Sequence, residues 1–249
     1  MRAACAVAEP RRPDTTFWVE SRAVEGDHLT LSREEGHHLT RVHRAPPGTR
    51  FQAIDGEGNL YDCVLDSVAG SGVRARIVGR SKEVGELRSP IHLLVGLPDW
   101  SGVEAVVAHT VPLGVRSLDF AACDRSGRGP IGETRLGRLK RLARAGIKQS
   151  RRTRLPEIRS SASLGAALAW LPAGGARYFA DPTGDPWRDP VAREAQPTVS
   201  LAVGPPGGYS AEERAALLGA SFAGISLGNS RLTTETASIA ILTLARNSL

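Results

Sequence analysis

The order of apolar and polar positions divides the chain near residue 90. Between about Thr15 and Gly79, short runs that mix β-branched or aromatic residues with polar ones are separated by turn residues, which predicts β-strands. Ser32 can cap one helix in this region, because Glu34 and Glu35 would lie in its first turn. The strands are expected at Thr16–Glu20, Thr49–Asp55, Asn59–Ser67 and Gly72–Gly79. A compact β-barrel of about 65 residues is the simplest closure of this set.

Residues 81–90 (SKEVGELRSP) are polar and end in proline, which predicts a linker. Beyond them, strand and helix patterns alternate, as in a parallel sheet covered by helices on both faces. Strands are expected at 91–97, 115–122, 176–180, 198–203 and 224–227, and helices at 103–109, at 134–149, after Ser210 and after Thr233 or Thr234. The predicted organisation is a mobile tail (1–14), a β-barrel domain (15–80), the linker (81–90) and an α/β domain (91–249).

Two glycine-bearing segments follow apolar runs near the C-terminus. They read VSLAVGPPGGYS (199–210) and ISLGNSRLTTETA (225–237). Glycine has no Cβ, so a ligand can lie directly against the main chain at Gly204, Gly207, Gly208 and Gly228. Because each segment predicts a strand, a loop and a helix in succession, both loops are expected at the carboxyl ends of parallel strands, where α/β sheets bind their ligands.

The net charge is +6, and the densest positive charge lies on the helix expected at Thr134–Gln149 and in the turn after it. Apolar residues recur at helical spacing there and would face the sheet, which leaves the arginines outside. This face is expected either to contact a phosphate backbone or to be a solvated surface whose C-terminal arginines complement the helix dipole. The basic residues expected outside or at the helix end are Arg135, Arg138, Arg141, Lys148, Arg151, Arg152 and Arg154.

The cysteines and the distribution of apolar residues argue against a disulfide-rich, membrane-spanning or secreted protein. The three cysteines are widely spaced and odd in number, which argues against a disulfide framework or a zinc cluster and favours a reducing cytoplasm. The sequence has no apolar run of about 18 residues, so no membrane span is expected. Its start lacks the apolar region of a signal peptide.

Three candidate motifs have simpler interpretations. The glycines of residues 127–132 spell GxGxxG, but they lie several residues beyond a strand and Pro130 removes an amide, so a loop is expected. Adjacent histidines such as His37 and His38 would point apart on a helix, and no cysteine or carboxylate cluster completes a metal site. Glu235 is the best candidate acid of the second glycine loop, although a carboxylate there can also belong to a helix cap.

The two glycine loops resemble those of the RsmE-type 16S ribosomal RNA uridine-N3 methyltransferases of the SPOUT superfamily. That family has GPEGG-aromatic-S and LGxxILRxETA where this chain has GPPGGYS (204–210) and LGNSRLTTETA (227–237). HHLTRVHR (37–44) resembles the family's HHLxxVLR, and QSRRTRLPEI (149–158) its QSxRxxxPxI. The resemblance covers roughly residues 15–249. It implies a PUA-like β-barrel, an α/β SPOUT domain with a C-terminal trefoil knot, and a homodimer completed through that domain.

The resemblance also implies a site. S-adenosylmethionine would be held largely by main-chain groups of three loops, at residues Ala180, Asp181, Pro182, Val203, Gly204, Gly208, Leu227, Gly228, Asn229, Leu232 and Thr233. Glu235 and Arg152 are the catalytic candidates. Ribosomal RNA or the small ribosomal subunit would be the partner, contacted by His37, His38, Arg41, Arg44, Arg138, Arg141, Arg151 and Arg152.

Four charged positions of the family pattern are lost in this chain. The lysine and glutamate of its KATELGV segment are His109 and Pro112, the glutamate of GPEGG is Pro206, and the arginine of ILRxETA is Thr233. The cofactor loops are therefore better preserved than the substrate-facing positions. Three functions stay open: methylation of uridine N3 in 16S rRNA, methylation of another acceptor such as a small heterocycle, and RNA binding or assembly without catalysis.

Overall fold

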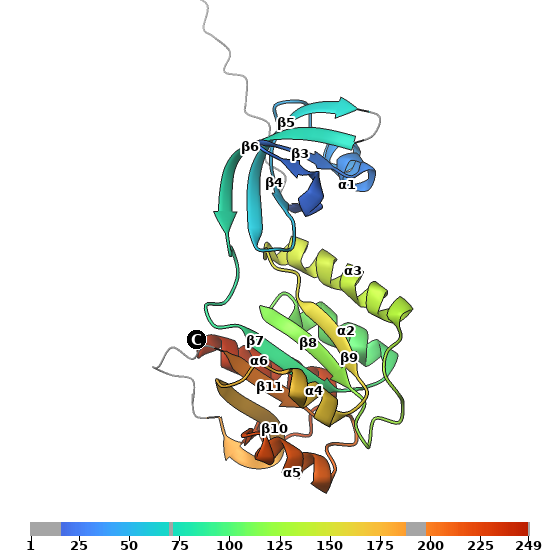
Figure 1. The fold of residues 1–249 in the computed structure, drawn as a ribbon, viewed down its shortest axis with the longest axis vertical. Coiled ribbons are helices and arrows are strands. Elements are labelled where there is room, and N and C mark those ends of the chain that lie inside the picture. The colour runs from blue at the N-terminus through green and yellow to red at the C-terminus, as the bar shows by residue number, and fades with distance from the viewer. Residues whose placement is uncertain (1–15, 70–71, 188–197, 249) are drawn as a thin grey trace, which may run out of the picture. The chain divides into compact units, whose positions relative to one another are not determined.

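The computed structural model describes residues 16–69, 72–187 and 198–248, which form two compact units (Figure 1). The first unit runs to Gly85 and also contains Ile147–Leu155; the second contains Glu86–Gly146 and the chain from Pro156 onward. This division differs from the contiguous organisation expected from the sequence at Ile147–Leu155. The predicted mobile tail, residues 1–14, lies outside the described residues.

The first unit is built on a mixed six-stranded sheet in the order β1-β4-β5-β6-β3-β2. β1 and β4 pair in parallel, and the other neighbours are antiparallel. Its elements are β1 (Thr16–Trp18), β2 (Val24–Glu25), β3 (His28–Leu31), α1 (Arg33–His37), β4 (Arg50–Ile54), β5 (Asn59–Ala69) and β6 (Gly72–Lys82), with a 3-10 turn at Ser21–Ala23 and a π-helical turn at His38–Val42. The predicted cap of α1 is confirmed, because the Ser32 hydroxyl accepts from the Glu35 N–H.

One apolar cluster forms the core of this unit. Phe17, Leu29, Leu39 and Phe51 are at most 1% exposed and come from β1, β3, the π-helical turn and β4. Burial of such side chains contributes roughly 1.5–3 kcal/mol each. The segment Ile147–Leu155 adds backbone hydrogen bonds, since the Gly58 N–H donates to the Thr153 carbonyl at 3.0 Å.

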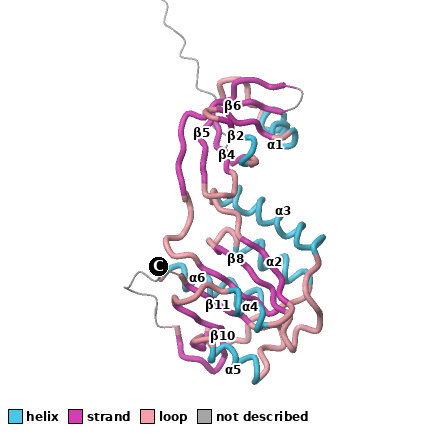
Figure 2. Tube along the Cα trace, in the orientation of Figure 1, coloured by secondary structure: helices cyan, strands magenta, loops and turns pink. Residues whose placement is uncertain are grey.

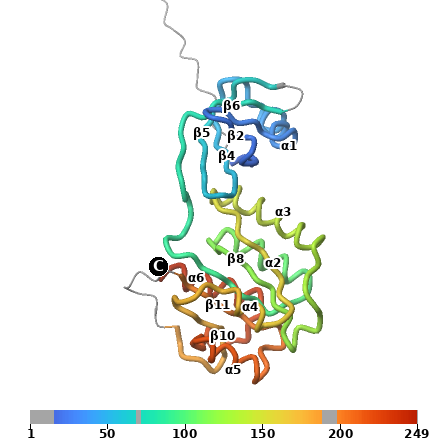
Figure 3. Tube along the Cα trace, viewed as in Figure 1, coloured from blue at the N-terminus to red at the C-terminus, as the bar shows by residue number. Residues whose placement is uncertain are grey.

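The second unit alternates strands and helices, as Figures 2 and 3 show along the chain. Its elements are β7 (Ile91–Gly96), α2 (Trp100–Thr110), β8 (Val115–Ala121), α3 (Glu133–Ser150, of which the unit holds the part up to Gly146), β9 (Glu157–Ser161), α4 (Leu164–Trp170), β10 (Ala176–Pro186), β11 (Val199–Val203), α5 (Ala211–Gly219), β12 (Ala223–Ser226) and α6 (Thr234–Asn247). The predicted parallel sheet is confirmed, and its order is β12-β10-β11-β7-β8-β9.

This strand order determines where loops meet. β12, β10, β11 and β7 are consecutive neighbours and parallel, so the loops after these four strands lie at one edge of the sheet. Residues 127–132 are a loop, as expected. The sequence pattern missed β2, β3, β9 and α4. No helix in the described ranges is long and apolar enough to span a bilayer.

Candidate active site

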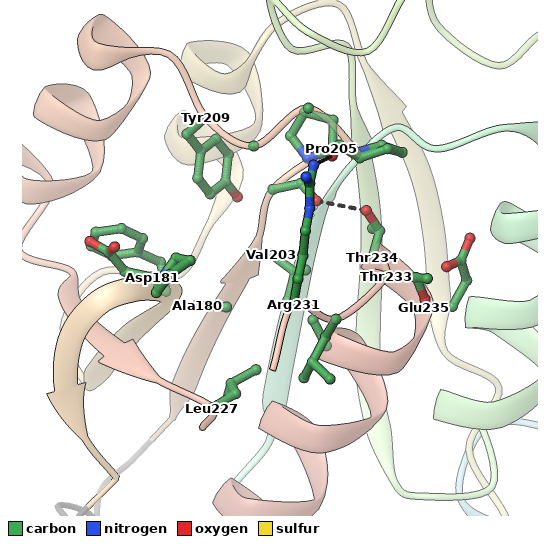
Figure 4. A pocket seen from close by; sticks show the side chains of 18 of the residues that line it. Ala180, Asp181, Val203, Pro205, Tyr209, Leu227, Arg231, Thr233, Thr234 and Glu235 are labelled. Atoms are coloured by element: carbon green, nitrogen blue, oxygen red, sulfur yellow. Dashed lines mark hydrogen bonds between the residues drawn. The ribbon is translucent and has the colours of Figure 1, made fainter. Parts of the chain in front are cut away.

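A cavity of about 1080 Å³ opens where the four neighbouring strands end (Figure 4). β10 contributes Phe179, Ala180, Asp181 and Pro182 from its middle, and β11 leads into the glycine loop at Gly204. β12 leads into the loop that starts at Leu227, and Pro98 and Asp99 follow β7. The eleven residues expected to bind a cofactor all line this cavity: Ala180, Asp181, Pro182, Val203, Gly204, Gly208, Leu227, Gly228, Asn229, Leu232 and Thr233.

Asp181, on the β10 side of the pocket, has a fully engaged carboxylate. Its Oδ1 accepts from the N–H and hydroxyl of Thr183, and its Oδ2 accepts from Arg214 Nε at 2.8 Å. Burial alone would raise the pKa of Asp181, but these hydrogen bonds and the Arg214 charge hold it below its usual value. A ligand at this position would therefore meet main chain rather than a free carboxylate.

The loop between β11 and α5 is fixed by a capping box. The Ser210 hydroxyl accepts from the Glu213 N–H, and the Glu213 carboxylate accepts from the Ser210 N–H. Ser210 also donates to Asp124 at 2.6 Å. Tyr209 next to the cap lies edge-on to Phe179, and its buried hydroxyl has no hydrogen-bond partner among the described residues. Burial raises the pKa of Tyr209 well above its usual value.

The loop between β12 and α6 is tied to the β11 loop. Thr234 donates from its hydroxyl to the Gly204 carbonyl at 3.0 Å, a bond drawn in Figure 4. Thr233 caps α6, because its hydroxyl accepts from the Thr236 N–H. Gly228 has φ +116, and a Cβ built on it meets no atom within 4 Å. The loop thus depends on glycine for its conformation and leaves open space at that residue.

Glu235 lines the pocket from the first turn of α6. It makes no hydrogen bond or ion pair with the described part of the chain. Its carboxylate lies against α2, since a Cβ built on Gly102 would come within 2.1 Å of Glu235 Oε1. A free acid is therefore held over the helix backbone beside the pocket, while the cap itself comes from Thr233.

Arg152 is not among the residues that line the cavity. It belongs to the first unit and is 2% exposed, so its predicted place on a basic surface was wrong. The cause is local: Arg151 adopts φ +58 at the end of α3, and the Arg152 N–H donates to the Ile147 carbonyl at 3.1 Å. This is the hydrogen bond of a Schellman motif, which turns the chain sharply after the helix.

The other basic residues expected to contact RNA differ in their environments. Exposed side chains belong to His37, Arg41, Arg44, Arg138, Arg141 and Arg151, whereas His38 is half-buried. Arg138 pairs with Glu104 at 2.6 Å. The His38 ring stacks on His43 at 4.9 Å, and partial burial together with His38 lowers the pKa of His43. The described residues contain no group of histidine, cysteine, aspartate or glutamate that could hold a metal ion.

Arg231 is a pocket residue that sequence reasoning missed. The family pattern has an apolar residue at this position. The resemblance therefore implied a role in the site only for neighbouring residues of the loop. In the structure it lines the pocket and contacts the Pro206 carbonyl. Only the sheet order, which brings the two loops together, reveals it.

Comparisons with known proteins agree with this architecture. Residues 85–246 match the family model of the RNA methyltransferase domain, and residues 31–78 match that of the RNA methyltransferase PUA domain. Ribosomal RNA small subunit methyltransferase E of Mycobacterium bovis is 27% identical over 91% of this chain and 88% of its own length. The protein of the same name from Synechocystis is 26% identical over 84% and 69%.

Solved structures share the fold. A methyltransferase from Legionella pneumophila, solved with bound S-adenosylmethionine, is 25% identical, with a TM-score of 0.79 over 94% of this chain and 97% of that one. The small subunit methyltransferase E of Neisseria gonorrhoeae, 22% identical, has a TM-score of 0.81 over 94% and 97% of the two chains. The family model spans more than half of the sequence, and the chain therefore belongs to the RNA methyltransferases of the RsmE type.

Proposed function

We propose that this protein methylates N3 of a uridine in 16S rRNA, with S-adenosylmethionine as the methyl donor. The observation that carries the proposal is the pocket at the ends of β10, β11 and β12, in a chain of the RsmE type. The curated relatives are named as small subunit rRNA methyltransferases, and the Legionella relative holds S-adenosylmethionine.

The construction of the pocket fits this cofactor. Adenine and ribose can be recognised by backbone N–H and C=O groups, and the glycine loops offer such groups without side chains in the way. Gly204, Gly208 and Gly228 lie in two of these loops, and Ala180–Pro182 would present main chain because the Asp181 carboxylate is engaged. When bound, the cofactor supplies a methyl group activated by its sulfonium.

The acceptor requires loss of a proton. Uracil N3–H is a weak acid, so the pocket must align N3 with the methyl group and provide a base. Glu235 is the uncommitted carboxylate of the lining and is the group we assign to receive the N3 proton.

RNA would be held outside the pocket by exposed basic side chains. Those of Arg41 and Arg44 lie on the barrel domain, proposed to span residues 15–80, and those of Arg138 and Arg141 lie on α3 of the methyltransferase domain, proposed to span residues 91–249 beyond the linker. Phosphate contacts of this kind position a nucleic acid without reading its sequence. A protein that modifies ribosomal RNA would work in the cytoplasm.

We also propose that the C-terminal chain is knotted. β12 lies outside β10, whereas α6, which follows β12, returns to pack against α2, β7 and β11. The chain end therefore passes β10 a second time, close to the loops that line the pocket. This return fits the trefoil knot of SPOUT domains, which are rare exceptions to the absence of knots.

The proposed assembly is a homodimer through the second unit. Light scattering at micromolar concentration is expected to give twice the 26.4 kDa mass of the chain. The reason is that SPOUT sites are completed by a second protomer, so that a monomer would lack part of its substrate site. A 26.4 kDa species that still methylates RNA would contradict the dimer.

One observation favours a second candidate, methylation of a small heterocycle. Pro206 and Thr233, two positions where family charges are lost, both line the pocket. The acceptor surface is therefore altered at the site itself.

The test offers labelled S-adenosylmethionine in parallel with small ribosomal subunits that lack the modification and with a small-molecule extract. We expect label in 16S rRNA, and mass spectrometry of the digested RNA should show 3-methyluridine. Label in a small molecule alone would favour the second candidate, and cofactor or RNA binding without any transfer would indicate a non-catalytic factor.

A further inference from the structure

The side chain of Arg231 extends along the pocket from the loop between β12 and α6 (Figure 4). Its Nη2 reaches the Pro206 carbonyl at 3.4 Å, which is a long hydrogen bond. The contact joins the loop after β12 to the loop after β11. The guanidinium therefore belongs to the lining of the cavity, and the exposed Arg231 side chain is free to take a stronger acceptor.

The charges around the pocket single out this arginine. Asp181 and Arg214 form an ion pair at 2.7 Å and neutralise each other. Asp99 caps α2, because its Oδ1 accepts from the Gly102 N–H at 2.7 Å. Of the charged residues that line the pocket, Arg231 and Glu235 remain, and neither has an ion-pair partner in the described ranges. The pocket thus offers one uncommitted cation and one uncommitted anion.

The position of Arg231 can be compared with that of the arginine in the family pattern of this loop. The pattern LGxxILRxETA has isoleucine at the position of Arg231 and arginine at that of Thr233. In this chain Thr233 is occupied as the cap of α6, with its hydroxyl accepting from the Thr236 N–H at 3.3 Å. The loop keeps one arginine, which stands two positions before the N-cap of α6 and lines the pocket.

We propose that Arg231 is a catalytic residue that stabilises the anionic acceptor base, an inference that rests on the proposed uridine methylation. As the N3–H bond breaks, its proton passes to the Glu235 carboxylate and negative charge spreads over N3 and the two carbonyl oxygens. The N3 electron pair then bonds the methyl carbon while the carbon–sulfur bond breaks and leaves its pair on sulfur. The guanidinium can donate to a carbonyl oxygen of the imide anion, which carries part of the charge and leaves the N3 electron pair to the methyl carbon.

This role is electrostatic. Donors directed at developing charge in a partly desolvated site contribute about 10²–10³-fold to the rate, because they need no reorganisation during the reaction. Arg231 would leave the weak Pro206 contact and gain a charge-assisted hydrogen bond when the base enters. Its effect should therefore appear in the chemical step and not in cofactor affinity.

The experiment compares R231Q and R231K with the wild type and with R116Q, a matched control at the start of β8, at the opposite end of the strands from the pocket. We expect R231Q to lower kcat by about 10²–10³-fold with cofactor affinity by calorimetry unchanged. Activity of R231Q should keep rising with pH where the wild type levels off, because without the nearby cation the N3 pKa of the bound base is higher and the anion forms only at higher pH. R231K should retain part of the activity, and R116Q all of it.

A variant that moves the arginine back to position 233 distinguishes a catalytic role of the guanidinium from an effect of Arg231 on the structure of the loop. R231I combined with T233R restores the arrangement of the family pattern and should recover most of the activity lost in R231I alone, despite loss of the Thr233 cap of α6. Full kcat in R231Q, or equal losses of kcat and cofactor affinity, would overturn the role of Arg231 and leave the proposed function standing. No methyl transfer to RNA by the wild type would overturn the proposed function and this assignment with it.

Discussion

Replacement of Gly228 by valine is expected to abolish binding of S-adenosylmethionine, weakening it by about 100-fold or more, while the protein stays folded. A Cβ at this residue meets no atom within 4 Å, so the added branch would occupy open space beside the cavity and clash with nothing in the protein. The φ of +116 adds local strain of about 1–3 kcal/mol, which a folded domain can absorb. Calorimetry with the cofactor and a thermal unfolding curve measure the two effects.

Gly174→Val is the matched control for this variant. Gly174 also has a positive φ, +77, and open space around its Cβ position, but it does not line the pocket. The control should share the loss of thermal stability and keep the affinity. If both variants bind the cofactor like the wild type, the cofactor site lies elsewhere. Gly204→Val is a poorer probe, because its Cβ would press on Tyr209 at 3.3 Å and disturb the loop itself.

Gly102→Ala should lower the rate of methyl transfer without a matching loss of stability. Alanine is the better helix former by about 0.5–1 kcal/mol, and Gly102 lies within α2. The new Cβ would come within 2.1 Å of Glu235 Oε1, however, and the flexible carboxylate would move aside. Because a displacement of about 1 Å can cost 10²-fold in rate, methyl transfer should fall by about that factor. The Cβ would also press on Pro98 at 3.0 and 3.1 Å, which opposes the gain in helix propensity, so the unfolding midpoint should change little.

Two further variants locate the cause of that loss. Gly165→Ala in α4 changes a helical glycine whose nearest neighbour is 3.8 Å away, and it should leave the rate intact. Glu235→Gln should reduce the rate at least as far as Gly102→Ala, and the double variant should add little to either. A fully active Gly102→Ala enzyme would show that the position of the Glu235 carboxylate is unimportant.

The sequence predicted the elements whose signals are local. The capping box of α5 requires only Ser210 and Glu213, and the buried strands β7 and β11 are apolar except for His92 and Ser200. β9 was missed because it is an edge strand that pairs only with β8, so most of its residues can be polar. β3, with four residues, is too short to show an alternation.

The candidate site was predictable only where the glycine loops define it. The eleven positions that the resemblance of these loops implies for the cofactor all line the pocket, and cofactor binding by them stays a prediction. Arg152 was misplaced because its burial follows from the turn after α3, where Arg151 adopts a positive φ that the helical pattern does not reveal. Arg231 was missed because the family pattern has an apolar residue at its position. Its place in the pocket becomes evident only when the sheet order is known, with β11 and β12 on either side of β10.

The assignment of Ile147–Leu155 to the first unit has a consequence for how this protein can be divided or recombined. The polypeptide passes between the units three times, so a single proteolytic cut near residue 85 would not yield two complete halves. A fragment that ends there lacks the Thr153 carbonyl that accepts from Gly58 and the Gly56–Arg154 bridge. A gene segment encoding the N-terminal unit alone would therefore not be an exchangeable module, and exchange between relatives would succeed only if the short internal segment were transferred as well.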